Sequence, residues 1–347
     1  PLVTLPDRMF FCITSYFSYI YYLQENTGIV CPQRECRLYL FVYFQKKRRF
    51  YMILQLEHIQ KNYGTKTVLK DCTFSFERGK IYGLLGRNGA GKTTLINTFV
   101  GILCGDSGTI RVDGQDVRTL GKAFLSQIGY MPQYPIFYRD FTVKDFLLYM
   151  CALKDIPANQ AQDRVLELLA TVNLTDAQEK KIGALSGGMR QRVGIVQAML
   201  SDPKILILDE PTAGLDPSER IRFRNLISRF AQGRTILLAT HIVSDVECIA
   251  REILLLKQGT LIMQGTPAAL EQNIEGKVWN VTVGAEDAAL LTDMYCVSNM
   301  KQEGEHFTLR IVEDGCPIKT AQPVQPNLED VFLYYCRGER HDTSDTV

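Results

Sequence analysis

The segment from residue 80 to residue 100 constrains the fold of this chain more than any other part of the sequence. A strand-length apolar run, Lys80–Leu85, precedes a glycine-rich stretch, and a helical pattern follows from Lys92 to about Val100. The stretch reads Gly86, Arg87, Asn88, Gly89, Ala90, Gly91, Lys92 and Thr93, followed by Thr94. It fits the spacing G-x-x-x-x-G-K-[ST], in which glycines allow successive backbone N–H groups to converge on phosphate oxygens. The sequence therefore predicts a phosphate-binding loop between a strand and a helix.

Two adjacent acidic residues, Asp209 and Glu210, directly follow a buried-strand pattern at residues 205–208. In parallel sheets, ligand chemistry takes place at the carboxyl ends of the strands. Beside a phosphate loop, Lys92 is expected to reach the β- and γ-phosphates and the Thr93 hydroxyl to ligate Mg²⁺. Asp209 is expected to hold Mg²⁺ through water, and Glu210 to polarise the attacking water. These two motifs predict an enzyme that hydrolyses a nucleoside triphosphate.

The rest of the pattern is that of an α/β protein. From Met52 onward, short apolar runs alternate with longer helical ones, which is typical of a mainly parallel sheet. We expect a phosphate-loop NTPase core with an antiparallel β subdomain at residues 52–270, and an inserted helical lobe at about residues 140–200. Residues 271–347 are expected to form a small α+β extension. With 46% hydrophobic and 22% charged residues, the 347-residue chain is neither disordered nor fibrous.

Residues 1–51 differ from the rest of the chain, because they hold 13 of its 34 aromatic residues and seven basic against three acidic residues. Three interpretations are open. A signal peptide fits poorly, because polar residues such as Thr14 interrupt the apolar run. A segment at a membrane interface fits the aromatic residues and the basic run Lys46–Arg49. A leader that is not translated fits best, since the globular pattern begins directly after Met52, and this is the interpretation we favour.

Charge and cysteine content exclude other classes of protein. A net charge of +1 gives no bulk attraction to nucleic acid, so no nucleic-acid partner is expected. No uninterrupted apolar stretch reaches the ~18 residues of a membrane-spanning helix. Ten cysteines without a C-x-x-C pair favour a reduced, cytosolic setting. We expect Cys72, Cys104 and Cys248 to be small core side chains.

A third motif lies between the phosphate loop and the acidic pair. It reads Leu185, Ser186, Gly187, Gly188, Met189, Arg190 and Gln191, and it closely resembles the signature peptide of ATP-binding cassette (ABC) proteins. Further positions match that family in its order, namely Tyr63, Gln133, Asp216 and His241. The resemblance covers about residues 53–270. Met189 departs from the more common glutamine, and with residues 327–333 it is similar to a branch that exports drugs, peptides, lipids or polysaccharides through separate membrane subunits.

The resemblance implies that two copies of the domain pack head to tail with ATP between them. Ser186, Gly187 and Gly188 of one copy would bind the ATP held by the phosphate loop of the other, and Asp216 would lie at the interface. Consensus residues for both half-sites in one chain favour a homodimer. The dimer would drive an integral membrane permease. We therefore expect a peripheral subunit at the cytoplasmic face of the cell membrane, with ATP and Mg²⁺ as its cofactors.

The resemblance also implies roles inside the site. Tyr63 would stack on adenine, Gln133 would bind Mg²⁺ and link the site to the helical lobe, and His241 would hold the γ-phosphate. Lys92 and Glu210 complete the catalytic set. The implied function is ATP hydrolysis coupled to export through a separate permease.

A soluble ABC-type ATPase that acts on ribosomes or DNA is the alternative. Ribosome-acting relatives usually carry two cassettes, and DNA-repair relatives carry a long coiled coil between the conserved halves. This chain has one cassette, and only ~90 residues without sustained heptads separate Lys92 from Ser186. An inactive regulatory cassette is disfavoured, because Lys92, Glu210 and His241 are all present.

Overall fold

The computed structural model describes residues 54–337. The aromatic-rich segment 1–51, to which the three interpretations above apply, lies outside the described residues, as does the chain from residue 338. The central element is a six-stranded sheet with the order β10-β9-β3-β8-β7-β6. Its strands are β3 (Ile81–Leu85), β6 (Ile128–Met131), β7 (Ile205–Asp209), β8 (Thr235–Thr240), β9 (Glu252–Lys257) and β10 (Thr260–Gly265). All neighbours are parallel except β9 and β10, which form an antiparallel hairpin.

Three longer helices lie between β6 and β7. Thr142 caps the first by accepting a hydrogen bond from the backbone N–H of Asp145, and Ser186 caps the third. They are α6 (Val143–Leu153), α7 (Ala158–Thr171) and α8 (Gly187–Met199), with the short 3-10 helices η2 (Thr175–Ala177) and η3 (Ile182–Ala184) between α7 and α8. The other helices connected to the central sheet are α3 (Lys92–Phe99), α9 (Pro217–Phe230), α10 (Val243–Glu247) and α11 (Pro267–Gln272).

A second sheet is antiparallel and has the strand order β2-β1-β4-β5. Its strands are β1 (Leu54–Tyr63), β2 (Lys66–Phe76), β4 (Ser107–Val112) and β5 (Gln115–Asp116), and the short helices α4 (Val117–Leu120) and α5 (Lys122–Leu125) follow. This sheet is the predicted antiparallel β subdomain.

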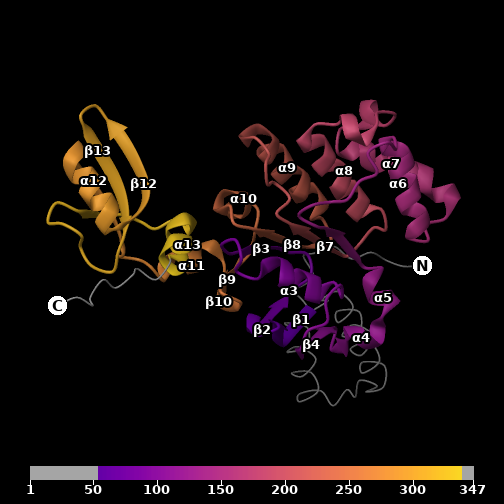
Figure 1. Cartoon of the computed structure of the whole chain (residues 1–347), viewed down its shortest axis with the longest axis horizontal. Helices are drawn as coiled ribbons and strands as arrows, with labels where there is room; N and C mark the ends of the chain where they lie inside the picture. The colour runs from indigo at the N-terminus through magenta and orange to yellow at the C-terminus, as the bar shows by residue number, and fades with distance from the viewer. Residues whose placement is uncertain (1–53, 338–347) are drawn as a thin grey trace, which may run out of the picture. The chain divides into compact units, whose positions relative to one another are not determined.

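Both faces of the central sheet are buried, which explains why its strands read as continuous apolar runs. Alternate residues of its inner strands pack into two different hydrophobic cores, one on each face of the sheet. In β3, Ile81 and Leu85 pack with residues of α6 to α9, whereas Tyr82 and Leu84 pack with α3 and the antiparallel sheet. Figure 1 shows α6 to α9 on one side of the sheet and α3, β1, β2 and β4 on the other. The predicted α/β class with a mainly parallel sheet is confirmed.

The C-terminal part of the described chain forms a third sheet, with the order β12-β13-β11-β14. Its elements are β11 (Val278–Gly284), α12 (Ala285–Met294), β12 (Cys296–Glu303), β13 (His306–Val312), β14 (Gln322–Pro323) and α13 (Leu328–Cys336). A capping box of Asn327 and Asp330 starts α13. Leu328 and Val331 share the larger core with residues of α10 and α11, on which α13 packs. The last helix therefore belongs to the core of the central sheet, although it is joined in sequence to the small one.

The prediction for the cysteines is wrong in two of three cases. Cys72 is buried, and its thiol donates to the carbonyl of Gly259 at 3.2 Å. Cys104 and Cys248 are exposed, because both follow the end of a helix, and the apolar residue Ile102 near Cys104 is exposed as well. Within residues 54–337, no helix combines the length and apolar content needed to cross a bilayer.

Candidate active site

The glycine-rich loop connects the end of β3 to the start of α3. Gly91 occupies the N-cap position of α3 with φ 105°, a left-handed conformation that side chains rarely adopt. A Cβ atom at Gly86 would lie 2.7 Å from the carbonyl oxygen of Leu256 in β9, so this position has no room for a side chain. The two glycines let the loop fold back over the helix and direct backbone N–H groups into one concave surface.

Lys92 is the first residue of α3, and its side chain is almost fully buried. The ammonium nitrogen donates to the carbonyl of Gly86 at 2.7 Å and to that of Arg87 at 3.3 Å. It also lies 3.1 Å from a carboxylate oxygen of Glu210. A buried cation needs such partners, because its removal from water is costly. Lys92 is therefore held at the mouth of the loop.

The carboxylate of Asp209 lies at the end of β7, beside the start of α3. The hydroxyl of Thr93 donates to its Oδ2 at 2.8 Å. Its other oxygen, Oδ1, is buried and has no hydrogen-bond partner among the described residues. Burial raises the pKa of this carboxyl above its usual value, and the neighbouring Glu210 adds to the effect. An unpaired oxygen next to a hydroxyl is a donor set suited to a hard cation such as Mg²⁺.

Glu210 is placed by the neighbouring strand β8. Its backbone N–H donates to the carbonyl of Ala239 at 2.8 Å, and its φ of 47° turns the chain sharply out of β7. The carboxylate lies 2.9 Å from Nδ1 of His241 and accepts a hydrogen bond from Thr240 at 3.2 Å. The parallel pairing of β7 and β8 thus brings together an acid and a histidine that are 31 residues apart in sequence.

A cavity of about 730 Å³ opens in front of these side chains. Its lining residues are Lys66, Thr67, Val68, Lys70, Asn88, Gly89, Gly91, Lys92, Thr93, Thr94, Gln133, Glu210, His241 and Gln258. The structure thus collects Gln133, Glu210 and His241 around the phosphate loop from the ends of three strands. Within residues 54–337, no cluster of three or more His, Cys, Asp or Glu side chains forms a metal site by itself, so a cation here would need phosphate oxygens as well.

Five of the lining residues were missed by the sequence analysis. They are Lys66, Thr67, Val68 and Lys70 of β2 and Gln258 in the turn between β9 and β10. Lys66 and Lys70, three and seven positions after Tyr63, were a usable signal, because phosphates attract cations. Nothing in the sequence indicated Gln258, which reaches the cavity because the β9–β10 turn packs on β2, where Gly259 accepts a hydrogen bond from Lys70 N–H.

Other predicted site residues do not line this cavity. Tyr63 ends β1 with an exposed ring, and Ala90 is buried under the loop. The Arg87 guanidinium points to the end of α13, 3.5 Å from the carbonyl of Cys336. Ser186, Gly187, Gly188 and Asp216 lie at the starts of α8 and α9. Their roles toward a nucleotide stay predictions.

The start of α8 is a second, more open glycine-containing helix terminus. Ser186 and Gly187 are exposed, and the Ser186 hydroxyl accepts a hydrogen bond from Met189 N–H at 3.3 Å. Gly188 is buried against α9, where a Cβ atom would lie 2.7 Å from a carboxylate oxygen of Glu219. Asp216 caps α9 by accepting from the N–H of Glu219 at 2.9 Å. The signature peptide and the Asp216 loop therefore meet at Glu219.

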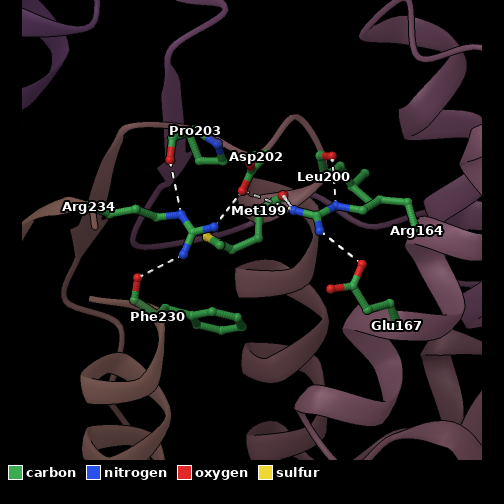
Figure 2. A network of polar contacts seen from close by, with 8 residues as sticks. All are labelled: Arg164, Glu167, Met199, Leu200, Asp202, Pro203, Phe230 and Arg234. Atoms are coloured by element: carbon green, nitrogen blue, oxygen red, sulfur yellow. Dashed lines mark hydrogen bonds and ion pairs between the residues drawn. The ribbon is translucent and has the colours of Figure 1, made fainter. Parts of the chain in front are cut away.

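The loop that leads into β7 is fixed by a polar network around Asp202 (Figure 2). Arg164 of α7 and Arg234 both bind the Asp202 carboxylate. Arg164 also donates to the carbonyl of Met199 at the end of α8, and Arg234 to that of Phe230 at the end of α9, each at 3.1 Å. The network joins the ends of two helices to the start of the strand that carries both acidic site residues.

Comparison with known proteins places this geometry among nucleotide-binding transport proteins. The ABC transporter family pattern matches residues 69–213. The Nod factor export ATP-binding protein I of Burkholderia orbicola is 33% identical over 299 residues, which cover 83% of this chain and 98% of that protein. An uncharacterized ABC transporter ATP-binding protein of Bacillus subtilis is 35% identical over 295 residues, which cover 81% of this chain and 98% of that protein. The solved structure of cbiO1 from Clostridium perfringens, part of the ABC transporter complex cbiONQ, has a TM-score of 0.58 and 31% identity, covering 63% of this chain and 90% of that one.

Proposed function

Because this chain belongs to the ATP-binding proteins of ABC transporters, we propose that it energises an exporter, with Glu210 as the residue that activates water for ATP hydrolysis. The chain is a nucleotide-binding ATPase. The observation that carries the proposal is the contact of Glu210 with Lys92 on one side and His241 on the other, at the wall of the cavity.

The contacts of Lys92 show how phosphate binding would prepare the site. Its ammonium group donates to the carbonyls of Gly86 and Arg87 and forms an ion pair with Glu210. Phosphate oxygens are stronger partners for an ammonium group than backbone carbonyls, so Lys92 would turn to the β- and γ-phosphates. Glu210 would then be released to accept a proton from water, with His241 and the Thr240 hydroxyl fixing its orientation.

Thr93 and Asp209, which are hydrogen-bonded to each other, would hold Mg²⁺. Thr93 and Gln133 line the cavity, and Asp209 lies behind Thr93 without lining it. The fit rests on the buried Asp209 oxygen that has no partner among the described residues. When bound, Mg²⁺ supplies positive charge between the β- and γ-phosphates. The raised pKa of Asp209 is consistent with a carboxylate whose charge is balanced only when a cation is present.

The exposed start of α8 supports a head-to-tail homodimer. Ser186 and Gly187 present a hydroxyl and backbone N–H groups to solvent, and the positive end of the α8 dipole favours an anion there. They are absent from the lining of the cavity in their own chain. A γ-phosphate bound to the phosphate loop of a second copy would complete this half-site, and its hydrolysis would remove the bridge between the copies.

An exposed apolar surface lies directly after Gln133 and supports a membrane partner. Tyr134 is 79% exposed and Ile136 is 88% exposed, and the rings of Tyr138 and Phe141 pack against each other and against the ring of Tyr149 in α6. Contiguous exposed apolar residues mark an interaction site. We assign this surface, here called the Gln133 patch, to a cytoplasmic segment of an integral permease, so that the protein is peripheral at the cytoplasmic face of the membrane.

The export assignment is supported by relatives whose sequences match this chain over almost their whole length. The Burkholderia protein that covers 83% of this chain is named for Nod factor export. This favours the transporter over the alternative of a ribosome- or DNA-acting ATPase.

Membrane co-purification tests the proposal. Tyr134→Asp with Ile136→Asp should remove the protein from the membrane fraction while ATP turnover in detergent-free solution stays within about twofold of wild type. Leu290→Asp with Met294→Asp on α12, whose side chains are 61% and 59% exposed, is the matched control and should leave membrane association intact. Loss of association in both variants, or recovery of the wild type with ribosomes, would contradict the assignment.

A further inference from the structure

Asp245 is a fully buried carboxylate that the hydrolysis site does not use. It lies in the first turn of α10, four residues after His241. Its Oδ2 accepts a hydrogen bond from the hydroxyl of Thr212, which is also buried. Its Oδ1 has no hydrogen-bond partner among the described residues. A buried charge of this kind is costly, so its retention needs an explanation.

Thr212 belongs to the loop that leaves the active site toward the second half-site. This loop runs from Glu210 to Asp216 and is closed by the bond from Leu215 N–H to the Thr212 carbonyl at 3.1 Å. Glu210, at the start of this loop, contacts His241, and Asp216, at its end, caps α9. The Thr212 hydroxyl is the link from the middle of this loop to α10.

A third segment reaches the same carboxylate. The guanidinium of Arg224 in α9 lies 3.8 Å from Asp245 Oδ1, and it donates to the backbone carbonyl of Ser244 at 2.9 Å. The separation allows ion pairing but exceeds a hydrogen bond. The loop, α9 and α10 therefore meet at Asp245, and a small approach of α9 would give Oδ1 its missing partner.

We propose that Asp245 is a positioning residue that ties the 210–216 loop to the helix after His241, so that Asp216 and His241 move together. The inference rests on the proposed function, because it assumes that Glu210 and His241 act on ATP. A rigid link between the two segments transmits displacement, since packed and hydrogen-bonded elements respond as units. Engagement of Asp216 by a second copy would then bring His241 and Glu210 into position for hydrolysis.

The first test compares two substitutions of the hydroxyl. Thr212→Val removes the bond to Asp245 at nearly constant volume, whereas Thr212→Ser keeps a hydroxyl. We expect Thr212→Val to lower kcat for ATP about tenfold with KM within twofold, and Thr212→Ser to retain wild-type kcat. Equal kcat in the two variants, or an effect confined to KM, would overturn the proposal.

A second variant separates positioning from stability, because Thr212→Val leaves a buried charge without its partner. The double variant Thr212→Val with Asp245→Val replaces the polar pair by apolar groups and should restore the thermal midpoint. If Asp245 positions the loop, kcat stays low in the double variant. If kcat returns with the thermal midpoint, the role is structural and the proposal is wrong.

Hydrogen exchange gives a readout that does not need turnover. In Thr212→Val, amide protection should fall together in residues 212–216 and 243–247, and Thr212→Ser should keep it. Exchange that rises in only one segment would refute the link. A wild-type protein without ATPase activity would refute the proposed function, while the exchange data would still decide whether the link exists.

Discussion

Two helix starts in this chain share the same ingredients but differ in their surroundings. The phosphate loop precedes α3 and the Ser186–Gly188 peptide precedes α8, and both combine glycines with a hydroxyl residue at a helix N-terminus. At α3, the buried ammonium of Lys92 contacts Glu210, and a cavity of about 730 Å³ lies in front. At α8, Ser186 is exposed, and among residues 54–337 its hydroxyl is hydrogen-bonded only to its own helix.

The difference shows which half-site is complete within one chain. The phosphate loop is surrounded by strand ends of its own sheet, so its cation, acid and histidine are already in contact. The signature peptide offers an anion site with no opposing wall among the described residues of the same chain. Substitutions at the first site should therefore affect the single chain, and those at the second only the assembled pair.

The largest effect is expected for Glu210→Gln. The amide keeps the shape and a contact to His241 but cannot take a proton from water, so kcat should fall about 10²–10⁴-fold. ATP binding should persist, and ATP-dependent dimers should accumulate in size-exclusion chromatography. Turnover within a few-fold of wild type, measured by phosphate release, would remove Glu210 from its role.

Lys92→Ala should weaken nucleotide binding in the single chain. Loss of one charge-assisted hydrogen-bonding group costs about 1.5–3 kcal/mol, which corresponds to about 10–150-fold in Kd. Fluorescence titration with a labelled ATP analogue measures the Kd of each variant. Lys70→Ala, which removes a more exposed cation from the same cavity, is the control and should change Kd less than fivefold. Equal losses in both variants would show a general electrostatic effect instead.

Ser186→Ala should affect the pair and spare the single chain. A hydrogen bond from a neutral hydroxyl to a charged phosphate is worth about 1.5 kcal/mol, so ATPase activity should fall about tenfold while ATP affinity of the monomer is unchanged. Thr142→Ala removes a similar cap from α6, with a 3.0 Å bond to Asp145 N–H, and controls for lost helix capping. A matching loss of activity in Thr142→Ala would show that the Ser186 effect is only one of stability.

The smallest effect is a pH dependence of stability from Asp209. Burial raises the pKa of this carboxyl in the folded state. Between its ordinary and its raised pKa, the folded chain binds more protons than the unfolded one, so this group costs stability as the pH rises. Asp209→Asn should match wild type at low pH and exceed its thermal midpoint by about 2 °C at pH 7–8, without nucleotide and with EDTA. A midpoint difference independent of pH would contradict this.

Much of the phosphate site could be predicted because its motifs are local. The spacing from Gly86 to Thr93 and the acidic pair after an apolar run each fix residue type and position within one strand–loop–helix unit. The hairpin formed by β9 and β10 and the capping box of α13 depend on local sequence in the same way, since turn and cap residues act over a few positions. In contrast, the predicted burial of Cys104 and Cys248 is wrong, because apolar neighbours in sequence do not show which side of an element faces the core.

The sequence by itself determined that this chain binds nucleotide phosphates and which side chains are available for it, because the geometry of a phosphate loop depends on neighbouring residues and backbone freedom. Only the tertiary structure decided that Gln258 and the start of β2 line the cavity, that α13 packs into the larger core, and that Thr212 and Asp245 meet. These contacts join segments that are distant along the chain, and strand order and packing, rather than local sequence, bring them together.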